Sequence, residues 1–354
     1  MATESTEGVT YYPVEVLREF TVQCFTAAGV PAEDARVVAE NLIEANLRGV
    51  DTHGITRLLG IYIKRLRAGL VNTRPNIRVV SESPSTVLLD GDNGLGAVVG
   101  RRAMELAIAR ARHAGSAWVG VRNSNHFGAC AHFTMMAARA DMVGIALTNG
   151  PKSMAPWGGV TPYLSTNPIS FAVPSDDGPV VLDMATSVVA KGHIFLAAAK
   201  GERIPEGWAM DKRGRPTTDP REAIEGLVMP LAGHKGYGLS MMIDILCGIL
   251  TGGAFGPYIG SLYTDMDRPQ QVGHLFGAID ISRFVPVEEF KTRLGQMVRE
   301  IRSCERAEGV ERIYVPGEIE AEKAARRLRE GVPIPEPIRQ EFIAVARELG
   351  VPFE

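Results

Sequence analysis

The chain has 354 residues, enough for a large buried core, and its 45% hydrophobic and 22% charged residues are typical of a globular protein. A formal net charge of −3, with no stretch that concentrates Lys or Arg, argues against a nucleic-acid partner. The longest apolar run, "LSMMIDILCGIL", contains Asp244 and is too short to cross a bilayer, so we expect no membrane partner.

The periodicity of apolar residues changes twice along the chain. Between residues 13 and 69 apolar positions recur at intervals of three and four, which predicts helices. From about residue 86 there are short β-rich runs, which are "TVLLDG", "AWVGVR", "VGIALTN", "PISFAVP" and "PVVLDMA". Helices are predicted between them at 101–113, 129–140 and 237–250, and beyond them at 286–307 and 317–331, with a last helix after the prolines. This pattern predicts an α/β fold with a layered sheet, beside which the helical ends of the chain pack together.

The stretch "ANLRGVDTHGITRLL", residues 45–59, places an imidazole and a guanidinium at a turn between two helices. Asp51 or Thr52 is expected to cap the second helix, and His53 and Arg57, four residues apart, to share a face of its first turn. A cation is unfavourable at a helix N-terminus unless an anion accompanies it, so a substrate carboxylate is the expected partner of Arg57. The same positive end would keep His53 neutral and able to exchange a proton. Alternatively, His53 caps a carbonyl and Arg57 pairs with a neighbouring acid.

A second junction, "VRNSNHFGACAHF" at residues 121–133, leads from a strand into a helix. His126 follows the carboxyl end of the strand, where open α/β sheets bind ligands, so we expect it to face a crevice. A polar turn with an incidental histidine is the alternative. His132 lies on a different helical face, so the two are not expected to share a metal.

The stretch "LAGHKGYGLSMMIDIL", residues 231–246, has the composition of a phosphate site. Gly233, Gly236 and Gly238 are expected to leave their N–H groups exposed, Lys235 adds a charge, and a helix begins near Tyr237. The spacing is not that of a P-loop, but a pyrophosphate could bind here.

Several other motifs point away from common enzyme classes. Gly94, Gly96 and Gly100 resemble a dinucleotide-binding fingerprint with one extra residue, but Arg122 stands where an acid is expected, so a tight turn is the simpler interpretation. We predict no metal, because HExxH and Cys/His clusters are absent, and no GxSxG elbow indicates a serine hydrolase. Four separated cysteines and an acidic N-terminus indicate a cytoplasmic protein.

Several blocks, in order between residues about 45 and 335, together resemble one family. They are "RGVDTHGITRL", "NSNHFG", "MAPWGG", "STNPISFAVP", "VLDMATS", "GERIPEGWAMDKRGRPTTDP", "GHKGYGLSMMIDIL" and "VPGEIE". The chain is similar to the type-2 malate/L-lactate dehydrogenases, a family that includes ureidoglycolate and sulfolactate dehydrogenases, diketogulonate reductase and piperideine-2-carboxylate reductases. The resemblance implies hydride transfer between NAD or NADP and C2 of a small 2-hydroxy or 2-oxo acid. It also implies a homodimer with a three-layer, mixed-sheet, non-Rossmann fold.

The resemblance also assigns roles to residues of this sequence. His53 would exchange the proton at the substrate oxygen, or His126 would, and Arg57 would bind the carboxylate; Thr166 would contact substrate. The positions that match cofactor contacts are His126, Phe127, Gly128, Asp183, Met184, Ala185, His234, Lys235, Gly236, Pro316, Gly317 and Glu318. Residues 10–122 with 288–354 would form a helical, substrate-side domain and residues 123–287 a cofactor-binding domain.

Three positions depart from the family pattern. Thr52 replaces a common Ser before the histidine but keeps the hydroxyl, so we include it among the catalytic candidates. His193 stands where the imine reductases have an Asp, which argues against a cyclic imino acid as substrate; a ureidoglycolate-type substrate stays open. Lys152 contacts substrate or nicotinamide, or is a solvated loop lysine. A hydrolase that uses Thr52 and His53, and a catalytically silent metabolite binder, are the alternatives from other classes.

Overall fold

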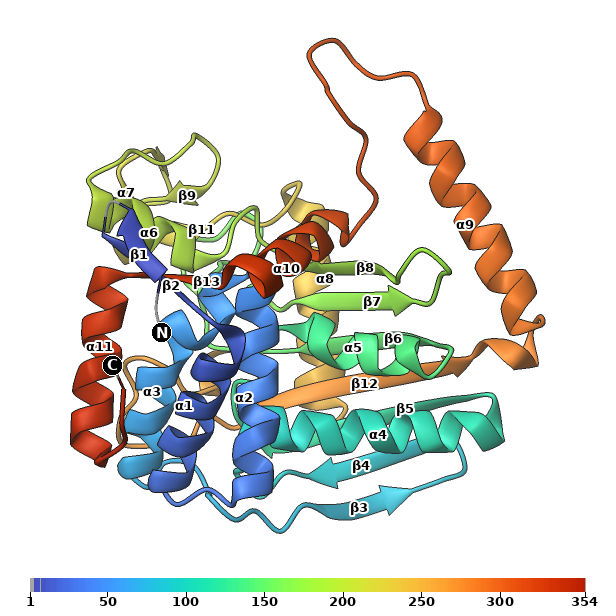
Figure 1. Ribbon diagram of the computed structural model, residues 1–354, viewed down its shortest axis with the longest axis horizontal. Helices are drawn as coiled ribbons and strands as arrows, with labels where there is room; N and C mark the ends of the chain where they lie inside the picture. Colours follow the sequence, from blue (N-terminus) through green and yellow to red (C-terminus); the bar gives the residue numbers. More distant parts are fainter. Residues whose placement is uncertain (1–2, 7, 354) are drawn as a thin grey trace.

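A seven-stranded sheet lies at the centre of the computed structural model, which describes residues 3–6 and 8–353 (Figure 1). Its strands, in spatial order, are β3 (Arg78–Glu82), β4 (Thr86–Asp90), β5 (Ser116–Ser124), β12 (Val272–Asp280), β6 (Met142–Thr148), β7 (Ile169–Val173) and β8 (Val180–Met184). Only β4 and β5 run parallel; every other neighbouring pair in this sheet is antiparallel. The mixed α/β fold predicted from the sequence is confirmed at this level.

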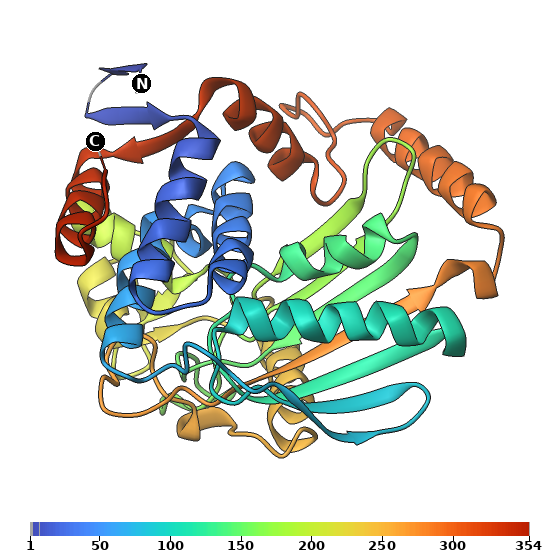
Figure 2. The same ribbon diagram turned by 60° about the horizontal axis from the view of Figure 1, so that its bottom comes forward.

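Helices cover both faces of the sheet (Figure 2). Helices α4 (Gly96–Ala114) and α5 (Cys130–Arg139) pack on one face, where their apolar side chains share a core with β4, β5, β6 and β12. Helix α8 (His234–Asp244) and the π-helical turn η2 (Ile245–Ile249) pack on the other face against β5, β6 and β12. The sheet is therefore shielded from solvent over its central strands.

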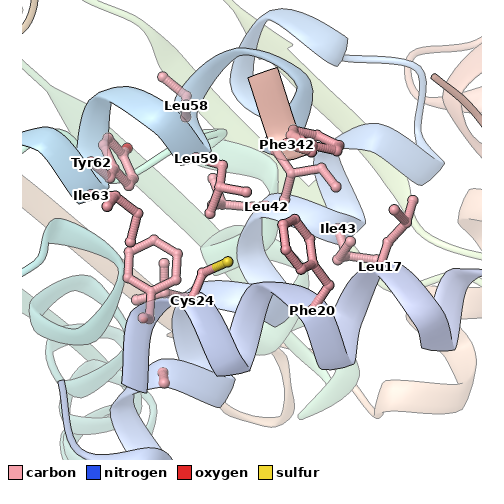
Figure 3. Packing of buried hydrophobic residues seen from close by; sticks show 14 of the residues in the cluster. Leu17, Phe20, Cys24, Leu42, Ile43, Leu58, Leu59, Tyr62, Ile63 and Phe342 are labelled. Carbon is pink, nitrogen blue, oxygen red and sulfur yellow. The ribbon is translucent and has the colours of Figure 1, made fainter. Parts of the chain in front are cut away.

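The two ends of the chain form a helical core beside the sheet. It contains α1 (Val14–Ala27), α2 (Ala32–Leu47), α3 (Ile55–Arg67) and α11 (Glu336–Leu349), and Figure 3 shows Phe20, Leu42 and Phe342 meeting within it. Strand β2 (Val9–Tyr12) pairs with β1 (Thr3–Thr6) and with β13 (Val332–Pro335). The helices predicted within 13–69 are present, whereas the proline segment near residue 333 forms a strand.

A smaller unit and several short elements complete the fold. The smaller unit contains α6 (Lys191–Lys200), β9 (Ala209–Met210), β10 (Pro216–Thr217), α7 (Pro220–Glu225) and β11 (Leu227–Val228). The charged helices predicted near the end are α9 (Val287–Ser303) and α10 (Glu318–Glu330). The short turns are η1 (Asp51–His53), η3 (Gly256–Tyr258) and η4 (Ile281–Arg283). Within the described residues no helix is long and apolar enough to cross a membrane.

The seven-stranded sheet runs across the boundary expected at residue 122. Strands β3, β4 and β5, within the segment 78–124, pair into the same sheet as β6, β7, β8 and β12. The apolar core beneath α4 joins these strands as well. The division into residues 10–122 with 288–354 and residues 123–287 stays a prediction.

Candidate active site

The turn after α2 is held by Asn46 rather than by the residues expected to cap α3. Asn46 Oδ1 accepts the N–H of Ile55 at 2.7 Å, and its Nδ2 donates to Asp51 Oδ1 at 2.7 Å. Asp51 also pairs with Arg327 of α10, at 2.7 Å. The prediction that Asp51 or Thr52 caps α3 is therefore wrong, because Asn46 supplies the cap and the C-terminal helix holds Asp51.

His53 lies at the end of η1, two positions before the first residue of α3, rather than inside that helix. Gly54, extended at φ −96° and ψ −173°, separates His53 from α3, so the predicted shared helical face with Arg57 is wrong. The His53 Nδ1 lies 2.9 Å from Thr52 Oγ1. Burial, reinforced by nearby His193, lowers the pKa of His53 to about 4. The ring is therefore neutral at pH 7, as expected, although desolvation is the main cause.

His126 lies directly beside His53, although the two are 73 residues apart in the sequence. Their rings stack with centroids 5.7 Å apart and planes 20° from parallel. Burial and the neighbouring His53 and His274 lower the pKa of His126 to about 3. Its backbone N–H donates to Gln270 Oε1 at 3.1 Å, and its Nδ1 lies 2.6 Å from the hydroxyl of Tyr62. The structure thus brings the two predicted acid/base candidates together.

Arg57 is exposed and lies over two aromatic rings. Its Cζ is 4.9 Å from the ring centroid of Tyr263 and 5.7 Å from that of Phe195. No ion pair formed among residues 3–6 and 8–353 involves Arg57, so the alternative pairing with a neighbouring acid is not observed. Stacking over rings uses the faces of a guanidinium, while its N–H donors lie in its plane. Arg57 is therefore suited to receive a carboxylate.

A buried arginine on the same helix holds the loop that carries Tyr263. Arg65 is 1% exposed and donates to backbone carbonyl oxygens of the segment 261–268. The acceptors are Ser261 (3.3 Å), Leu262 (3.4 Å), Asp265 (2.7 Å) and Arg268 (3.1 Å). Sequence reasoning missed Arg65, Tyr263 and Gln270, because each acts on a partner far away along the chain.

Phe127 does not face the site with its side chain. Its ring is 1% exposed and stacks on His274 at 4.5 Å and 6°. The two ring nitrogens of His274 lie 2.7 Å from Thr148 Oγ1 and 2.9 Å from Ser124 Oγ. A cofactor contact from Phe127 could therefore involve only its backbone, because the ring is part of the core between the sheet and helices α4 and α5.

The residues matched to cofactor contacts follow one another through hydrogen bonds. Asp183, which precedes Met184 and Ala185 at the end of β8, accepts the N–H of Ala131 at 2.7 Å through Oδ2. Thr186, the residue after Ala185, is hydrogen-bonded on both sides. Its N–H donates to the Thr166 carbonyl at 3.0 Å, and its carbonyl accepts from the Leu231 N–H at 2.9 Å. Gly236 in turn donates to the Leu231 carbonyl at 2.8 Å. A continuous row of hydrogen-bonded residues thus joins the start of α5 to the start of α8.

Helix α8 begins at His234, three residues before the predicted start. The N–H groups of Gly233 and Gly236 donate to Pro230 (3.2 Å) and Leu231 (2.8 Å), so the prediction that these glycines expose them is wrong. Gly236 has no room for a side chain, because a Cβ would lie 2.3 Å from the Leu231 carbonyl. His234 and Lys235 occupy the first turn, which contains no acidic residue and no side-chain cap. This helix start has the charge and donors that a phosphate requires.

The segment 316–318 lies along β8. The Pro316 carbonyl accepts the N–H of Val181 at 3.0 Å, and Gly317, at φ +91°, packs against Val181. Burial opposes ionisation of Glu318, but the Val315 N–H and two arginines, Arg302 and Arg312, hold its pKa below the usual range. Glu318 is therefore already paired within the chain. Lys152 is exposed in the connection between β6 and β7, and its role stays a prediction.

Comparison with known proteins identifies the family. Residues 12–342 match the family model described as malate/L-lactate dehydrogenase. The chain belongs to the malate/L-lactate dehydrogenase family. The resemblance carried by the sequence blocks is thereby confirmed, and nicotinamide-dependent oxidation of 2-hydroxy acids is the activity of this family.

Individual relatives cover nearly the whole chain. The malate dehydrogenase of Pyrococcus horikoshii is 44% identical over 347 residues, which are 96% of this chain and 95% of that protein. Its solved structure matches with a TM-score of 0.91 at 41% identity and covers 100% of both chains. The chain is 37% identical to the ureidoglycolate dehydrogenase (NAD(+)) of Escherichia coli K12, over 94% of this chain and 95% of that protein. It is 40% identical to the (2R)-3-sulfolactate dehydrogenase (NADP(+)) of Chromohalobacter salexigens, over 74% of this chain and 79% of that protein. Both nicotinamide cofactors therefore occur among relatives of this family member.

Proposed function

We propose that this family member interconverts a small 2-hydroxy acid and its 2-oxo acid, of the malate or lactate type, with NAD or NADP. The observation that carries the proposal is the stacked pair of neutral imidazoles, His53 and His126, together with the unpaired guanidinium of Arg57, four residues after His53. A nucleophile, a metal cluster or a phosphate loop is not needed for this chemistry, whereas a carboxylate anchor and a proton-exchanging group are.

The side chains divide between binding and proton exchange. Arg57 binds the C1 carboxylate, and the aromatic rings of Tyr263 and Phe195 hold its guanidinium plane in place. An imidazole of the pair His53 and His126 contacts the C2 oxygen and moves its proton, and Thr52 orients His53 through Nδ1. Thr166 and Lys152 complete the substrate side.

The cofactor would be held along the hydrogen-bonded row described above. The start of α8, with His234 and Lys235 and without an acid or a cap, fits the pyrophosphate. The remaining parts of the dinucleotide would lie against Asp183 and Met184 of β8 and Ala185 directly after it, with 316–318 beside them, and against the backbone of 126–128. When bound, the nicotinamide supplies or accepts the hydride at C2.

We further propose that the dinucleotide does not bind as it does in a Rossmann fold. The fold is instead a three-layer arrangement with helices on both sides of the sheet. The Rossmann fold has a mostly parallel sheet, whereas this sheet is antiparallel apart from β4 and β5. Gly96, the central glycine of the fingerprint-like stretch, faces the backbone of residues 125–126, because a Cβ there would lie 2.1 Å from the Asn125 carbonyl. The glycines there serve close packing.

A homodimer in the cytoplasm is part of the proposal. Large apolar side chains remain exposed on several elements, which are Phe284 (74%), Leu250 (65%), Tyr258 (63%), Leu328 (61%) and Met297 (57%). Figure 1 places α9 at the edge of the molecule, where a second copy could cover it. Sedimentation equilibrium should give twice the mass of the chain; a monomer at micromolar concentration contradicts the dimer. The four cysteines are free thiols, as a reducing compartment requires.

The experiment is a panel of 2-oxo acids assayed with NADH and with NADPH. It includes oxaloacetate, pyruvate, sulfopyruvate and a cyclic imino acid, for wild type and His53→Ala. We expect turnover with at least one 2-oxo acid, reduced about 10²- to 10⁴-fold in His53→Ala. NADH binding followed by fluorescence, without turnover of any acid, indicates a silent metabolite binder. Failure to bind either cofactor overturns the proposal and leaves the hydrolase that uses Thr52 and His53.

A further inference from the structure

Tyr62 belongs to the helical core, but its hydroxyl leaves that core. The residue is 5% exposed on α3, where its ring lies beside Ile63 and Leu59 (Figure 3) and meets Phe25 edge-on at 6.5 Å. The hydroxyl lies 2.6 Å from His126 Nδ1 and 3.2 Å from the carbonyl oxygen of the same residue. Tyr62 is therefore a buried group that contacts the ring of a site histidine from the side of the helical core.

The backbone identifies which ring nitrogen of His126 carries the proton. The N–H of Gly128 points at Nδ1 from 3.4 Å, and an N–H can only donate. A proton on Nδ1 would face that N–H, so Nδ1 presents its lone pair. The Tyr62 hydroxyl faces two acceptors, Nδ1 at 2.6 Å and the His126 carbonyl at 3.2 Å, and donates its single proton to the nearer Nδ1. The single proton of the neutral imidazole is then on Nε2.

We propose that Tyr62 is a positioning residue that fixes His126 as the Nε2–H tautomer, so that His126 donates a hydrogen bond to the substrate oxygen and leaves proton exchange to His53. The inference rests on the proposed function and deepens it, because it separates the roles of the two histidines.

The proton balance supports this division. If His126 released its Nε2 proton to the substrate, Nδ1 would have to take a proton from Tyr62, the group in contact with it. Burial raises the pKa of Tyr62 well above its usual value, so the hydroxyl keeps its proton. His53 has no such constraint, because its Nδ1 contacts the Thr52 hydroxyl, which can donate or accept. In the oxidation direction the substrate hydroxyl proton therefore passes to His53, which becomes an imidazolium.

The direct test is the tautomer of His126, measured by nitrogen and carbon chemical shifts of the protein labelled in histidine, at pH 7. The His126 signals are assigned by their loss in His126→Gln. We expect the Nε2–H form in wild type and a larger share of the Nδ1–H form in Tyr62→Phe, because only the longer contact from the Gly128 N–H, at 3.4 Å, then remains at Nδ1. An Nδ1–H tautomer in wild type overturns the proposal, and this measurement does not depend on catalysis.

Kinetics test the role. Tyr62→Phe should lower kcat about 10-fold, as expected for the loss of one hydrogen bond, while the KM for NADH is unchanged. Tyr12→Phe is the matched control, since it removes another buried hydroxyl of the same core, one that accepts from Arg339 at 3.0 Å, and should leave kcat unchanged. An unchanged kcat in Tyr62→Phe overturns the positioning role.

Two substitutions of His126 distinguish hydrogen-bond donation by this residue from acceptance of a proton. Glutamine presents an N–H near the place of Nε2 but cannot accept a proton, whereas leucine does neither. His126→Gln should retain about 10-fold more turnover than His126→Leu, as expected for one hydrogen bond. Equal loss in both variants contradicts the donor role. If wild type turns over no substrate at all, the proposed function fails, and the tautomer measurement still decides the place of the proton.

Discussion

The imidazole rings of His53 and His126 stack 5.7 Å apart at the point where α3 and the connection from β5 to α5 meet. Both rings have lowered pKa values, about 4 for His53 and about 3 for His126, because burial disfavours the imidazolium. Two positive charges at this separation repel each other, so the pair of neutral rings takes up at most one additional proton during the reaction. The pair is thus prepared to receive a single proton from a hydroxyl group.

The first prediction concerns the pH dependence of 2-hydroxy acid oxidation. A base must be neutral to accept the proton, so kcat/KM should fall only below the pKa of the pair. With the pKa of His53 at about 4, the acid limb of the profile should lie near pH 4 rather than near pH 6.5. Initial rates with brief exposure to acid measure it, and activity regained on return to pH 7 excludes unfolding. An acid limb near pH 6.5 would mean that the acting histidine is solvated.

The second prediction concerns Arg57. Its N–H donors have no carboxylate partner among the described ion pairs, so the substrate carboxylate should be their main acceptor. Arg57→Ala should raise the KM for the 2-oxo acid about 10- to 100-fold, as expected for a charge-assisted hydrogen bond, with no change in NADH binding.

The control for Arg57 is Arg36→Ala, which removes an exposed arginine from α2, outside the site. This variant should have the KM of wild type. If Arg57→Ala weakens NADH binding and leaves the KM for the acid unchanged, the guanidinium serves the cofactor instead.

Local patterns in the sequence predicted most helices and several strands, but not the central strand β12. Its sequence, "VGHLFGAID", contains Gly273 and Gly277, which weaken a strand signal. The structure requires both, since a Cβ on Gly273 would lie 1.9 Å from the Cys247 carbonyl and one on Gly277 would lie 2.7 Å from the Trp118 ring. These approaches come from elements far away in sequence, so no local pattern contains them.

The candidate site was predictable where chemistry and turns coincide. His53, Arg57 and His126 stand out as polar side chains between apolar elements, and the structure brings all three to one region. Tyr62, in contrast, has the spacing of the buried apolar face of α3, and its hydroxyl partner lies 64 residues further on. The cap by Asn46 was also missed, because its acceptor oxygen serves Ile55, which lies nine residues further along the chain.

The third prediction concerns Arg65, which holds the loop under Tyr263. Arg65→Met preserves the length of the side chain but leaves buried carbonyl oxygens without a donor, each of which costs about 1–3 kcal/mol. Urea unfolding should show a loss of about 3 kcal/mol or more, and the KM for the 2-oxo acid should rise because Tyr263 no longer holds Arg57. Arg65→Lys keeps one charged donor group, so its free energy of unfolding and its KM should lie between those of wild type and Arg65→Met. If folded Arg65→Met has the KM of wild type, the loop held by Arg65 does not contribute to substrate binding.

The fourth prediction concerns stability in acid and His274. Burial lowers the pKa of His274 to about 3, although a hydrogen bond that the ring donates to the Asn125 backbone opposes this shift. In the unfolded chain a histidine takes up a proton below about pH 6.5, whereas the folded protein does not, so the contribution of neutral His274 is present above pH 6.5 and is lost as the pH falls toward 3. The free energy of unfolding should therefore fall by about 1.4 kcal/mol per pH unit from this residue alone.

Urea unfolding of wild type and His274→Gln at pH 7 and pH 5 measures this contribution. The variant loses ring contacts with Phe127 and should be less stable than wild type at both pH values. From pH 7 to pH 5, however, its free energy of unfolding should decrease by about 2 kcal/mol less than that of wild type. His53 and His126 remain in both proteins, so their contributions cancel in the comparison. His113→Gln removes an exposed histidine and should keep the wild-type pH dependence. Equal pH dependence in wild type and His274→Gln would mean that the hydroxyl oxygens of Thr148 and Ser124 accept hydrogen bonds from the protonated ring, and that the core beneath His126 does not depend on a neutral imidazole.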